Sequence, residues 1–289
     1  MDKHSFLIAL GILCLLPVSL FSRSRVVNDT IFSKKLNADR AYSVYLPPSF
    51  GEVQGKKYPV LYLFHGMSQT NQDWVGRGHV QEVADRLIYS QEACEMIIVM
   101  PDAGGDIYKE IWNGFFNMPG WLYEDFFFEE FLPYVENKYP IIGDKENRAV
   151  AGLSMGGGGA TGYGLWHADK FASVYAMSAL MSIPEEGAAR FDNPDSKLAI
   201  LTRAVIERSC IKRVTNADAG TIQALKSVRW FVDCGDDDFL LDRNIEFFQA
   251  MRKAGIPCQF RVRDGGHDWE YWHSALYRCL PFVSGTFNK

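Results

Sequence analysis

The stretch GGHDWEYWHSAL, residues 265–276, places His267 and His273 close together near the end of the chain. Histidine changes protonation near neutral pH, so either residue could act as a general base. A histidine among aromatic residues is more often a hydrogen-bonded residue with a structural role than a catalytic one. A catalytic interpretation therefore requires a nucleophile and an orienting carboxylate elsewhere in the sequence.

The strongest nucleophile candidate is Ser154, in the stretch AGLSMGGGG at 151–159. Gly152 to Gly156 form a G-x-S-x-G pattern between an expected strand and an expected helix, which is the context of a nucleophile elbow. Small residues on both sides let the backbone turn sharply there. The alternative is a glycine-rich turn whose serine only caps the helix. The flanking strand and helix favour the nucleophile.

The chain order Ser, acid, His of such sites selects the partners of this serine. His267 follows a glycine pair just beyond an expected strand, where open α/β sheets place their ligands, and we expect it to be the base. His273 lies in the final helix and is expected to be a packed or surface residue. The stretch DCGDDDFLL, residues 233–241, offers Asp236, Asp237 and Asp238 as the acid. Spacing alone does not choose among them.

Acyl transfer also needs hydrogen-bond donors for an oxyanion. The backbone N–H of Met155, directly after the nucleophile, is the first expected donor. The second is expected after the strand that ends in YLFHG, with Met67 N–H as first choice. His65 is expected to shape this loop and not to act as a base.

Seven apolar or alternating runs are typical of strands and are separated by helical patterns. The strand-like runs cover residues 40–50, 58–66, 95–102, 147–154, 171–179 and 228–235, and a further one covers 258–266. Helical patterns cover 80–90, 121–139 and 242–254. This alternation predicts a doubly wound, mostly parallel α/β sheet with helices on both faces. Residues 184–227 lack a clear strand and are expected to form a cap-like insertion within one domain.

Composition excludes several classes of function. A net charge of -5 and a pI near 5.7 argue against a nucleic-acid partner or an anionic membrane surface, since both favour clustered Lys and Arg. The sequence contains neither an H-E-x-x-H motif nor a phosphate-binding loop, so no metal or other cofactor is expected. The five cysteines after residue 24 show no C-x-x-C pair, so neither a disulfide framework nor a zinc site is indicated. A single disulfide, formed after export, is still an alternative.

Residues 1–24 resemble a secretory signal. A polar start with Lys3 precedes an apolar run from Phe6 to Phe21 that Pro17 interrupts. A stable membrane anchor needs about 20 apolar residues without an early helix breaker, and is not expected. We expect a secreted or periplasmic protein whose residues 25–289 form a single domain.

Several motifs together resemble the esterase D and feruloyl esterase group of the α/β-hydrolases, the group that includes carbohydrate esterase family one. They are YLFHGM, MPD, YEDFFFEEFLPYVENKYP, AGLSMGG, DCGDDDFL and GGHDWEYW, spread over roughly residues 40–280. The resemblance implies the α/β-hydrolase fold, with Ser154 as nucleophile and His267 as base. It also implies that the acid is Asp238, three positions after the glycine of its motif.

Five large aromatic residues precede the helical pattern at 121–139: Trp112, Phe115, Phe116, Trp121 and Tyr123. Their position after a strand predicts that they rise near Ser154, with about half of them packed in the core. We expect Trp112, Trp121 and Tyr123 to contact substrate. Flat apolar faces suit an aromatic acyl group or a sugar ring better than an acetyl group, and Trp112→Ala is expected to reduce such a preference.

The leading interpretation is a serine esterase that acts on acylated carbohydrate, such as feruloyl or acetyl esters of plant polysaccharide. One alternative is an acyltransferase of the mycolyltransferase type, in which a sugar hydroxyl replaces water. Another is a catalytically silent carbohydrate-binding module of the same fold. The intact set of Ser154, Asp238 and His267 argues against the silent module.

Overall fold

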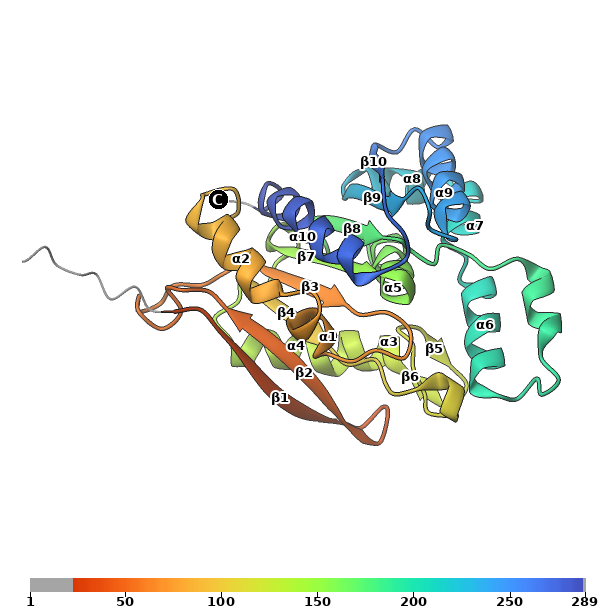
Figure 1. Cartoon of the computed structure of the whole chain (residues 1–289), viewed down its shortest axis with the longest axis horizontal. Coiled ribbons are helices and arrows are strands. Elements are labelled where there is room, and N and C mark those ends of the chain that lie inside the picture. The colour runs from red at the N-terminus through yellow and green to blue at the C-terminus, as the bar shows by residue number, and fades with distance from the viewer. Residues whose placement is uncertain (1–22, 288–289) are drawn as a thin grey trace, which may run out of the picture.

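The apolar runs of the sequence form the central strands of one sheet, with helices on both of its faces (Figure 1). The computed structural model describes residues 23–287, so the predicted signal at 1–24 lies almost wholly outside the described residues. The strands of the sheet are β1 (Arg25–Ser33), β2 (Ala38–Leu46), β3 (Val60–Phe64), β4 (Ile97–Pro101), β7 (Arg148–Leu153), β8 (Ser173–Met177), β9 (Arg229–Gly235) and β10 (Cys258–Arg263).

The strand order is β1-β2-β4-β3-β7-β8-β9-β10. From β4 to β10 all neighbours are parallel, whereas β1 pairs antiparallel with β2 and β2 pairs antiparallel with β4. This is the predicted doubly wound sheet, and its order is that of an α/β-hydrolase. The sequence did not predict β1. It forms the outer edge and carries few fully buried side chains, so its apolar pattern is weak.

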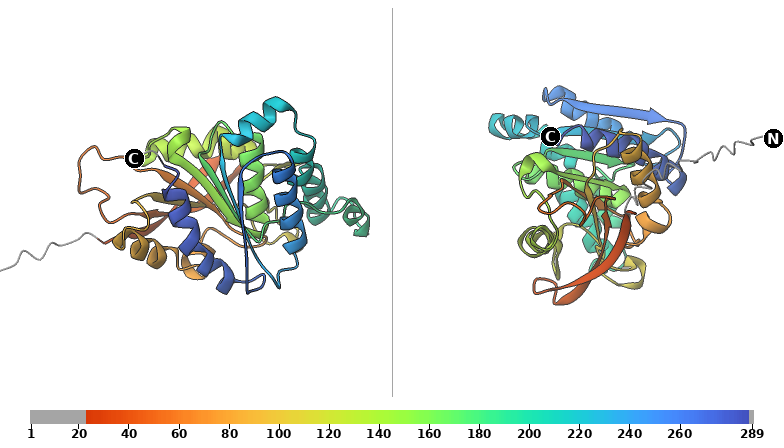
Figure 2. Two further views of the ribbon diagram at one scale, coloured as in Figure 1. Left: turned by 90° about the horizontal axis from the view of Figure 1, so that it is seen from above. Right: turned by 90° about the vertical axis from the view of Figure 1, so that its left-hand side faces the viewer.

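Two separate layers of buried side chains lie on the two faces of the sheet. One face is covered by α1 (Asp73–Gly76), α2 (Val80–Tyr89) and α10 (Trp269–Ser284). The other face is covered by α3 (Tyr123–Asp125), η2 (Phe126–Phe131), α4 (Leu132–Lys138), α5 (Ser154–Trp166) and α9 (Leu241–Lys253). Figure 2 shows the two helical layers from above and from the side.

The predicted helix at 121–139 is built from three consecutive pieces, because η2 is a π-helical segment between α3 and α4. The wider turn brings Phe126, Phe127 and Phe131 into the core together. A small hairpin of β5 (Asn117–Met118) and β6 (Trp121–Leu122) precedes it. The sequence pattern did not indicate this hairpin.

Residues 184–227 contain no strand and form η4 (Glu185–Arg190), α6 (Lys197–Glu207), α7 (Cys210–Thr215) and α8 (Ala219–Lys226). The part with η4 and α6 lies at one end of the molecule, at the right of Figure 1. Two short helices, η1 (Ile107–Lys109) and η3 (Lys145–Asn147), lie in loops. Within residues 23–287, no helix has the length and apolar character that spanning a bilayer requires.

Candidate active site

Parallel strands bring the residues of the site to one edge of the sheet. The carboxyl ends of β3 and β7 are in register at Phe64 and Gly152, and those of β9 and β10 are in register at Gly235 and Arg263. The loops that follow these strands therefore open side by side. This is the edge at which open α/β sheets bind their ligands.

Ser154 lies at the sharp turn between β7 and α5. Its φ is 54°, in the left-handed region that residues other than glycine seldom adopt. The turn requires close backbone packing, because a Cβ on Gly156 would lie 2.2 Å from the carbonyl oxygen of His65. A Cβ on Gly152 would lie 2.4 Å from the carbonyl oxygen of Gly156. The glycines of the pattern are thus needed for the geometry that projects the serine hydroxyl.

His267 connects this serine to a buried carboxylate. Its Nε2 lies 2.9 Å from Ser154 Oγ, and its Nδ1 lies 2.9 Å from Asp238 Oδ2. The Asp238 side chain has no exposed surface, and that of His267 is 17% exposed. The structure therefore brings together the three residues that the sequence placed in the loops after β7, β9 and β10. In this arrangement the imidazole can accept the serine proton while the carboxylate fixes the ring.

Two residues that the sequence analysis did not single out support this arrangement. Ser178, just after β8, lies near Asp238, and its hydroxyl helps to lower the pKa of this carboxylate. This hydroxyl also accepts the indole N–H of Trp272 at 3.0 Å. The Trp272 ring in turn packs edge-on against the His267 ring, with 4.9 Å between the centroids. The signal that could have identified Ser178 is its position at the carboxyl end of a strand.

The pKa of Asp238 is lower than the ordinary value of an aspartate. Burial by itself would raise this pKa, but the hydrogen bonds with His267 and with the backbone N–H of Leu240, together with the nearby Ser178 hydroxyl, outweigh burial. The carboxylate therefore stays ionised and can stabilise a protonated imidazole.

Asp236 and Asp237 have exposed side chains. Asp236 Oδ1 accepts the Gly265 N–H at 3.0 Å and so fastens the loop that carries His267. The carboxylates of Asp236, Asp237 and Asp264 lie within 4.8 Å of one another, on the surface. They form the only cluster with metal-ligand spacing within residues 23–287, and it lies apart from the carboxylate that contacts His267.

The other histidines near the sheet edge make different contacts. His65 is buried, its Nε2 accepts the Ala103 N–H at 2.9 Å, and its Nδ1 lies 2.7 Å from the Gly66 carbonyl oxygen. Burial lowers the pKa of His65, so a neutral ring joins two loops. His273 lies in α10, and its Nδ1 is 2.9 Å from the Gly78 carbonyl oxygen. Neither ring is bonded to Ser154.

An apolar pocket of about 240 Å³ opens at Ser154. Met67 and Met155, the two predicted oxyanion donors, both line it. Met155 is the second residue of α5, and the N–H groups of a first helical turn have no partner within the helix. The rest of the lining is aliphatic apart from Thr202 and Phe239, and comprises Leu180, Ile183, Leu198, Leu201, Thr202, Val205, Phe239 and Leu240.

Four of these lining residues, Leu198, Leu201, Thr202 and Val205, belong to α6. The sequence analysis assigned no role to any of them. Helical periodicity could indicate an apolar face on this segment, but not which cavity that face would close. Phe239 is 76% exposed and lies over the His267 ring, with 4.5 Å between the centroids. It forms the rim of the pocket.

Comparison with known proteins identifies the family of the chain. The family model described as "Esterase" matches residues 33–283. The chain belongs to the esterase family. The resemblance to the esterase D and feruloyl esterase group is thereby confirmed, and the protein is a carboxylic ester hydrolase.

Three relatives illustrate the range of similarity to this esterase. A solved structure of a ferulic acid esterase is 67% identical, with a TM-score of 0.89, and the match covers 92% of this chain and 100% of that one. An endo-1,4-beta-xylanase/feruloyl esterase of Xylanibacter ruminicola is 31% identical over 90% of this chain, which spans only 31% of that relative. An acetyl esterase of Caldicellulosiruptor saccharolyticus is 23% identical over 81% of this chain and 86% of its own length.

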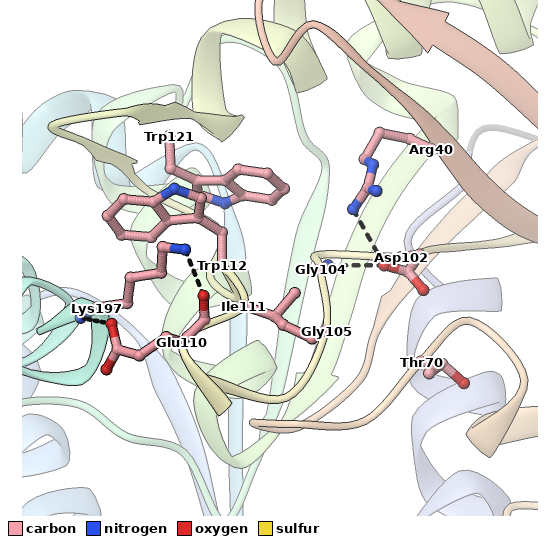
Figure 3. Close-up of a pocket in the computed structure, with 10 residues that line it drawn as sticks. All are labelled: Arg40, Thr70, Asp102, Gly104, Gly105, Glu110, Ile111, Trp112, Trp121 and Lys197. Carbon is pink, nitrogen blue, oxygen red and sulfur yellow. Dashed lines mark hydrogen bonds and ion pairs between the residues drawn. The ribbon is translucent and has the colours of Figure 1, made fainter. Parts of the chain in front are cut away.

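The structure changes the expectation for the aromatic residues of the esterase. Phe115, Phe116 and Tyr123 are buried, and the Tyr123 hydroxyl donates to the Asp102 carbonyl oxygen at 3.0 Å. The prediction that Tyr123 contacts substrate is wrong, because its side chain has no exposed surface. Trp112 and Trp121 do line a cavity (Figure 3), but it is a second one, which shares no lining residue with the pocket at Ser154. The expected effect of Trp112 on acyl preference loses its basis.

Proposed function

We propose that this esterase hydrolyses feruloyl or related hydroxycinnamoyl esters of plant polysaccharide through an acyl-enzyme on Ser154. The observation that carries the proposal is the continuous contact from Asp238 through His267 to Ser154, at the mouth of an apolar pocket. The 67% identity to a ferulic acid esterase supports the same substrate class.

In the proposed reaction, Ser154 Oγ attacks the ester carbonyl carbon while its proton passes to His267 Nε2. The carbonyl oxygen becomes an oxyanion, which the N–H groups of Met67 and Met155 stabilise. When the carbon–oxygen bond to the alcohol breaks, the imidazolium gives the proton to the departing sugar oxygen, which leaves as a hydroxyl. Water then attacks the acyl-enzyme with the same base, and the carboxylic acid leaves.

The pocket argues for an acyl group larger than acetyl. Its volume of about 240 Å³ corresponds to several water molecules, which each occupy about 30 Å³ in the liquid. An acetyl group would fill only a small part of this space, and water would occupy the rest in contact with aliphatic side chains. A planar hydroxycinnamoyl group would displace that water and bury its ring against the leucines of α6, which is favourable because apolar surface leaves water.

A matched pair of substrates tests the proposal. Feruloyl and acetyl esters of the same arabinose hydroxyl differ only in the acyl group. We expect kcat/KM to be higher for the feruloyl ester, and Ser154→Ala to remove activity on both. A higher kcat/KM for the acetyl ester would make the protein a carbohydrate acetylesterase. Transfer of the acyl group to an added sugar in preference to water would indicate an acyltransferase.

We also propose that the esterase is exported, on the basis of the apolar segment in residues 1–24. Plant polysaccharide is too large to enter a cell, so an enzyme that acts on it must meet it outside the cytoplasm. Mass spectrometry of the mature protein from its native host tests this proposal. We expect an N-terminus near residue 25, and an intact Met1 in the mature protein would contradict export by cleavage.

A further inference from the structure

The second cavity lies beside the site and has no part in the proposed reaction. Its volume is about 530 Å³, within the range of pockets that bind small molecules. Its walls come from segments that are distant in sequence: Arg40 on β2, Thr70, the loop from Asp102 to Trp112, Trp121 on β6 and Lys197 at the start of α6 (Figure 3).

Two indole rings form its apolar wall. The rings of Trp112 and Trp121 are nearly parallel, with 6.3 Å between centroids and 17° between planes. Trp121 is only 6% exposed, and its indole N–H already donates to the Gly114 carbonyl oxygen at 2.9 Å. The ring of Trp121 is therefore fixed by a buried hydrogen bond, and the Arg40 guanidinium lies 5.4 Å from its centroid. The Lys197 ammonium lies 5.3 Å from the centroid of the less buried Trp112, which supplies most of the indole surface that the cavity can offer.

Each charged side chain of the cavity has a partner within the lining. Arg40 Nη1 lies 3.7 Å from Asp102 Oδ1. The backbone N–H of Lys197 donates to Glu110 Oε2 at 3.0 Å, and its ammonium group donates to the Glu110 carbonyl oxygen. Two positive and two negative side chains thus balance in the lining. Such a cavity has no excess charge for an ionic ligand, but it holds polar atoms in fixed positions around an apolar wall.

Neighbouring residues line the cavity and the pocket at Ser154. The N–H of Ser68, next to Met67, donates to Asn113 Oδ1 at 3.3 Å, and Asn113 follows Trp112 directly. Lys197 lines the second cavity, whereas the adjacent Leu198 lines the pocket at Ser154. A substrate that fills the pocket with its acyl group and extends beyond the ester can reach the second cavity across this common wall.

We propose that the cavity between the two tryptophans and the Arg40–Asp102 pair binds a neutral sugar unit of the polysaccharide, away from the ester that is cleaved. The inference rests on the proposed function. A sugar ring has an apolar face of C–H groups, which packs on an indole, and a rim of hydroxyls, which bond to fixed polar atoms. A uronic acid fits less well, because each cation in the lining already has an anionic or carbonyl partner.

Two kinetic substrates test the inference: methyl ferulate, which has no sugar, and a feruloylated arabinoxylo-oligosaccharide. We expect Trp112→Ala to lower kcat/KM for the oligosaccharide ester about tenfold more than for methyl ferulate, since tenfold corresponds to the loss of one good aromatic contact. Trp112→Phe should restore part of this difference. The matched control is Tyr108→Ala, because Tyr108 is 66% exposed in the same loop and does not line the cavity. It should leave both substrates unaffected.

A binding measurement separates this inference from the proposed function. When the Ser154→Ala variant is titrated with unacylated xylotetraose, its tryptophan fluorescence should change. In the double variant Ser154→Ala/Trp112→Phe this change should be smaller. Saturable xylotetraose binding together with no activity on any feruloyl ester would overturn the proposed function and keep the sugar site. Equal losses on both substrates for Trp112→Ala, or the absence of xylotetraose binding, would overturn the sugar site even in an active feruloyl esterase.

Discussion

Asp238 Oδ2 lies 2.9 Å from His267 Nδ1, whereas the side chains of its two neighbours, Asp236 and Asp237, point to the surface. One of the three consecutive carboxylates thus contacts the imidazole, whereas the other two lie on the surface close to Asp264. Only Asp238 is positioned to orient the imidazole, and Asp236 instead holds the Gly265 N–H of the loop that precedes His267.

Asp238→Asn should therefore lower kcat by about 10⁴-fold, because an amide can hold the ring in the wrong tautomer and cannot stabilise its protonated form. Asp237→Asn is the matched control and should stay near wild type. Steady-state kinetics on methyl ferulate measure both. A larger loss for Asp237→Asn than for Asp238→Asn would show that the acid is misassigned.

The same carboxylate should make the stability of the fold depend on pH. The Asp238 pKa is held below the ordinary 3.8, so its ionised form favours the folded state. This contribution is complete above the ordinary pKa and is lost as the pH falls through the lower pKa of the folded protein. The difference in unfolding free energy between wild type and Asp238→Asn should therefore shrink as the pH falls below 3.8.

Urea denaturation across this pH range measures that difference. Ser178→Ala, which removes a hydroxyl that helps to lower the pKa of the carboxylate, should show a smaller change of the same sign. A difference that grows as the pH falls would contradict the assignment of a lowered pKa to Asp238.

Ser154→Ala should abolish labelling by a fluorophosphonate probe and lower kcat by about 10³-fold or more, because one hydroxyl forms the covalent bond. The fold should persist, since the substitution removes a single oxygen at an exposed edge of the sheet. Circular dichroism checks the fold. Labelling that survives in this variant would mean that another residue is the nucleophile.

His267→Ala should approach the loss seen for Ser154→Ala, and the double variant should lose little more, because the residues act as a unit. His273→Ala should remain within a few-fold of wild type, since its ring contacts the Gly78 carbonyl oxygen and not the serine. Single-turnover kinetics give both values. Equal losses from the two single variants would contradict the roles that the contacts indicate.

Leu198→Trp should reverse the preference between acyl groups by filling the pocket at Ser154. We expect kcat/KM for the feruloyl sugar ester to fall at least about tenfold, while the matched acetyl ester loses less, because a small acyl group needs little of the pocket. Glu207→Trp adds the same bulk at the exposed end of α6 and is the control. Parallel losses on both esters would argue that the pocket does not receive the acyl group.

Local patterns in the sequence were sufficient for β2, for the parallel strands of the sheet and for the position of Ser154, but not for the edge strand β1. Buried parallel strands leave continuous apolar runs, and a nucleophile elbow needs glycines at fixed positions around one serine. Both are properties of a few consecutive residues. The order of serine, acid and histidine then limited the base to His267 or His273, and the resemblance to an esterase group chose among the three aspartates.

Only the tertiary structure decided what each remaining side chain contacts. The pairing of β9 with β10 brings the loops that follow them together, and in the turn after β9 it is the side chain of Asp238, not that of Asp236 or Asp237, that reaches His267. Packing of α6 over the sheet edge makes the wall of the pocket from a segment whose sequence indicated no role. Tyr123 and Trp112 are both large aromatics in one loop, yet one is buried and the other lines a cavity. Such differences depend on contacts between segments distant in the chain, which no local pattern encodes.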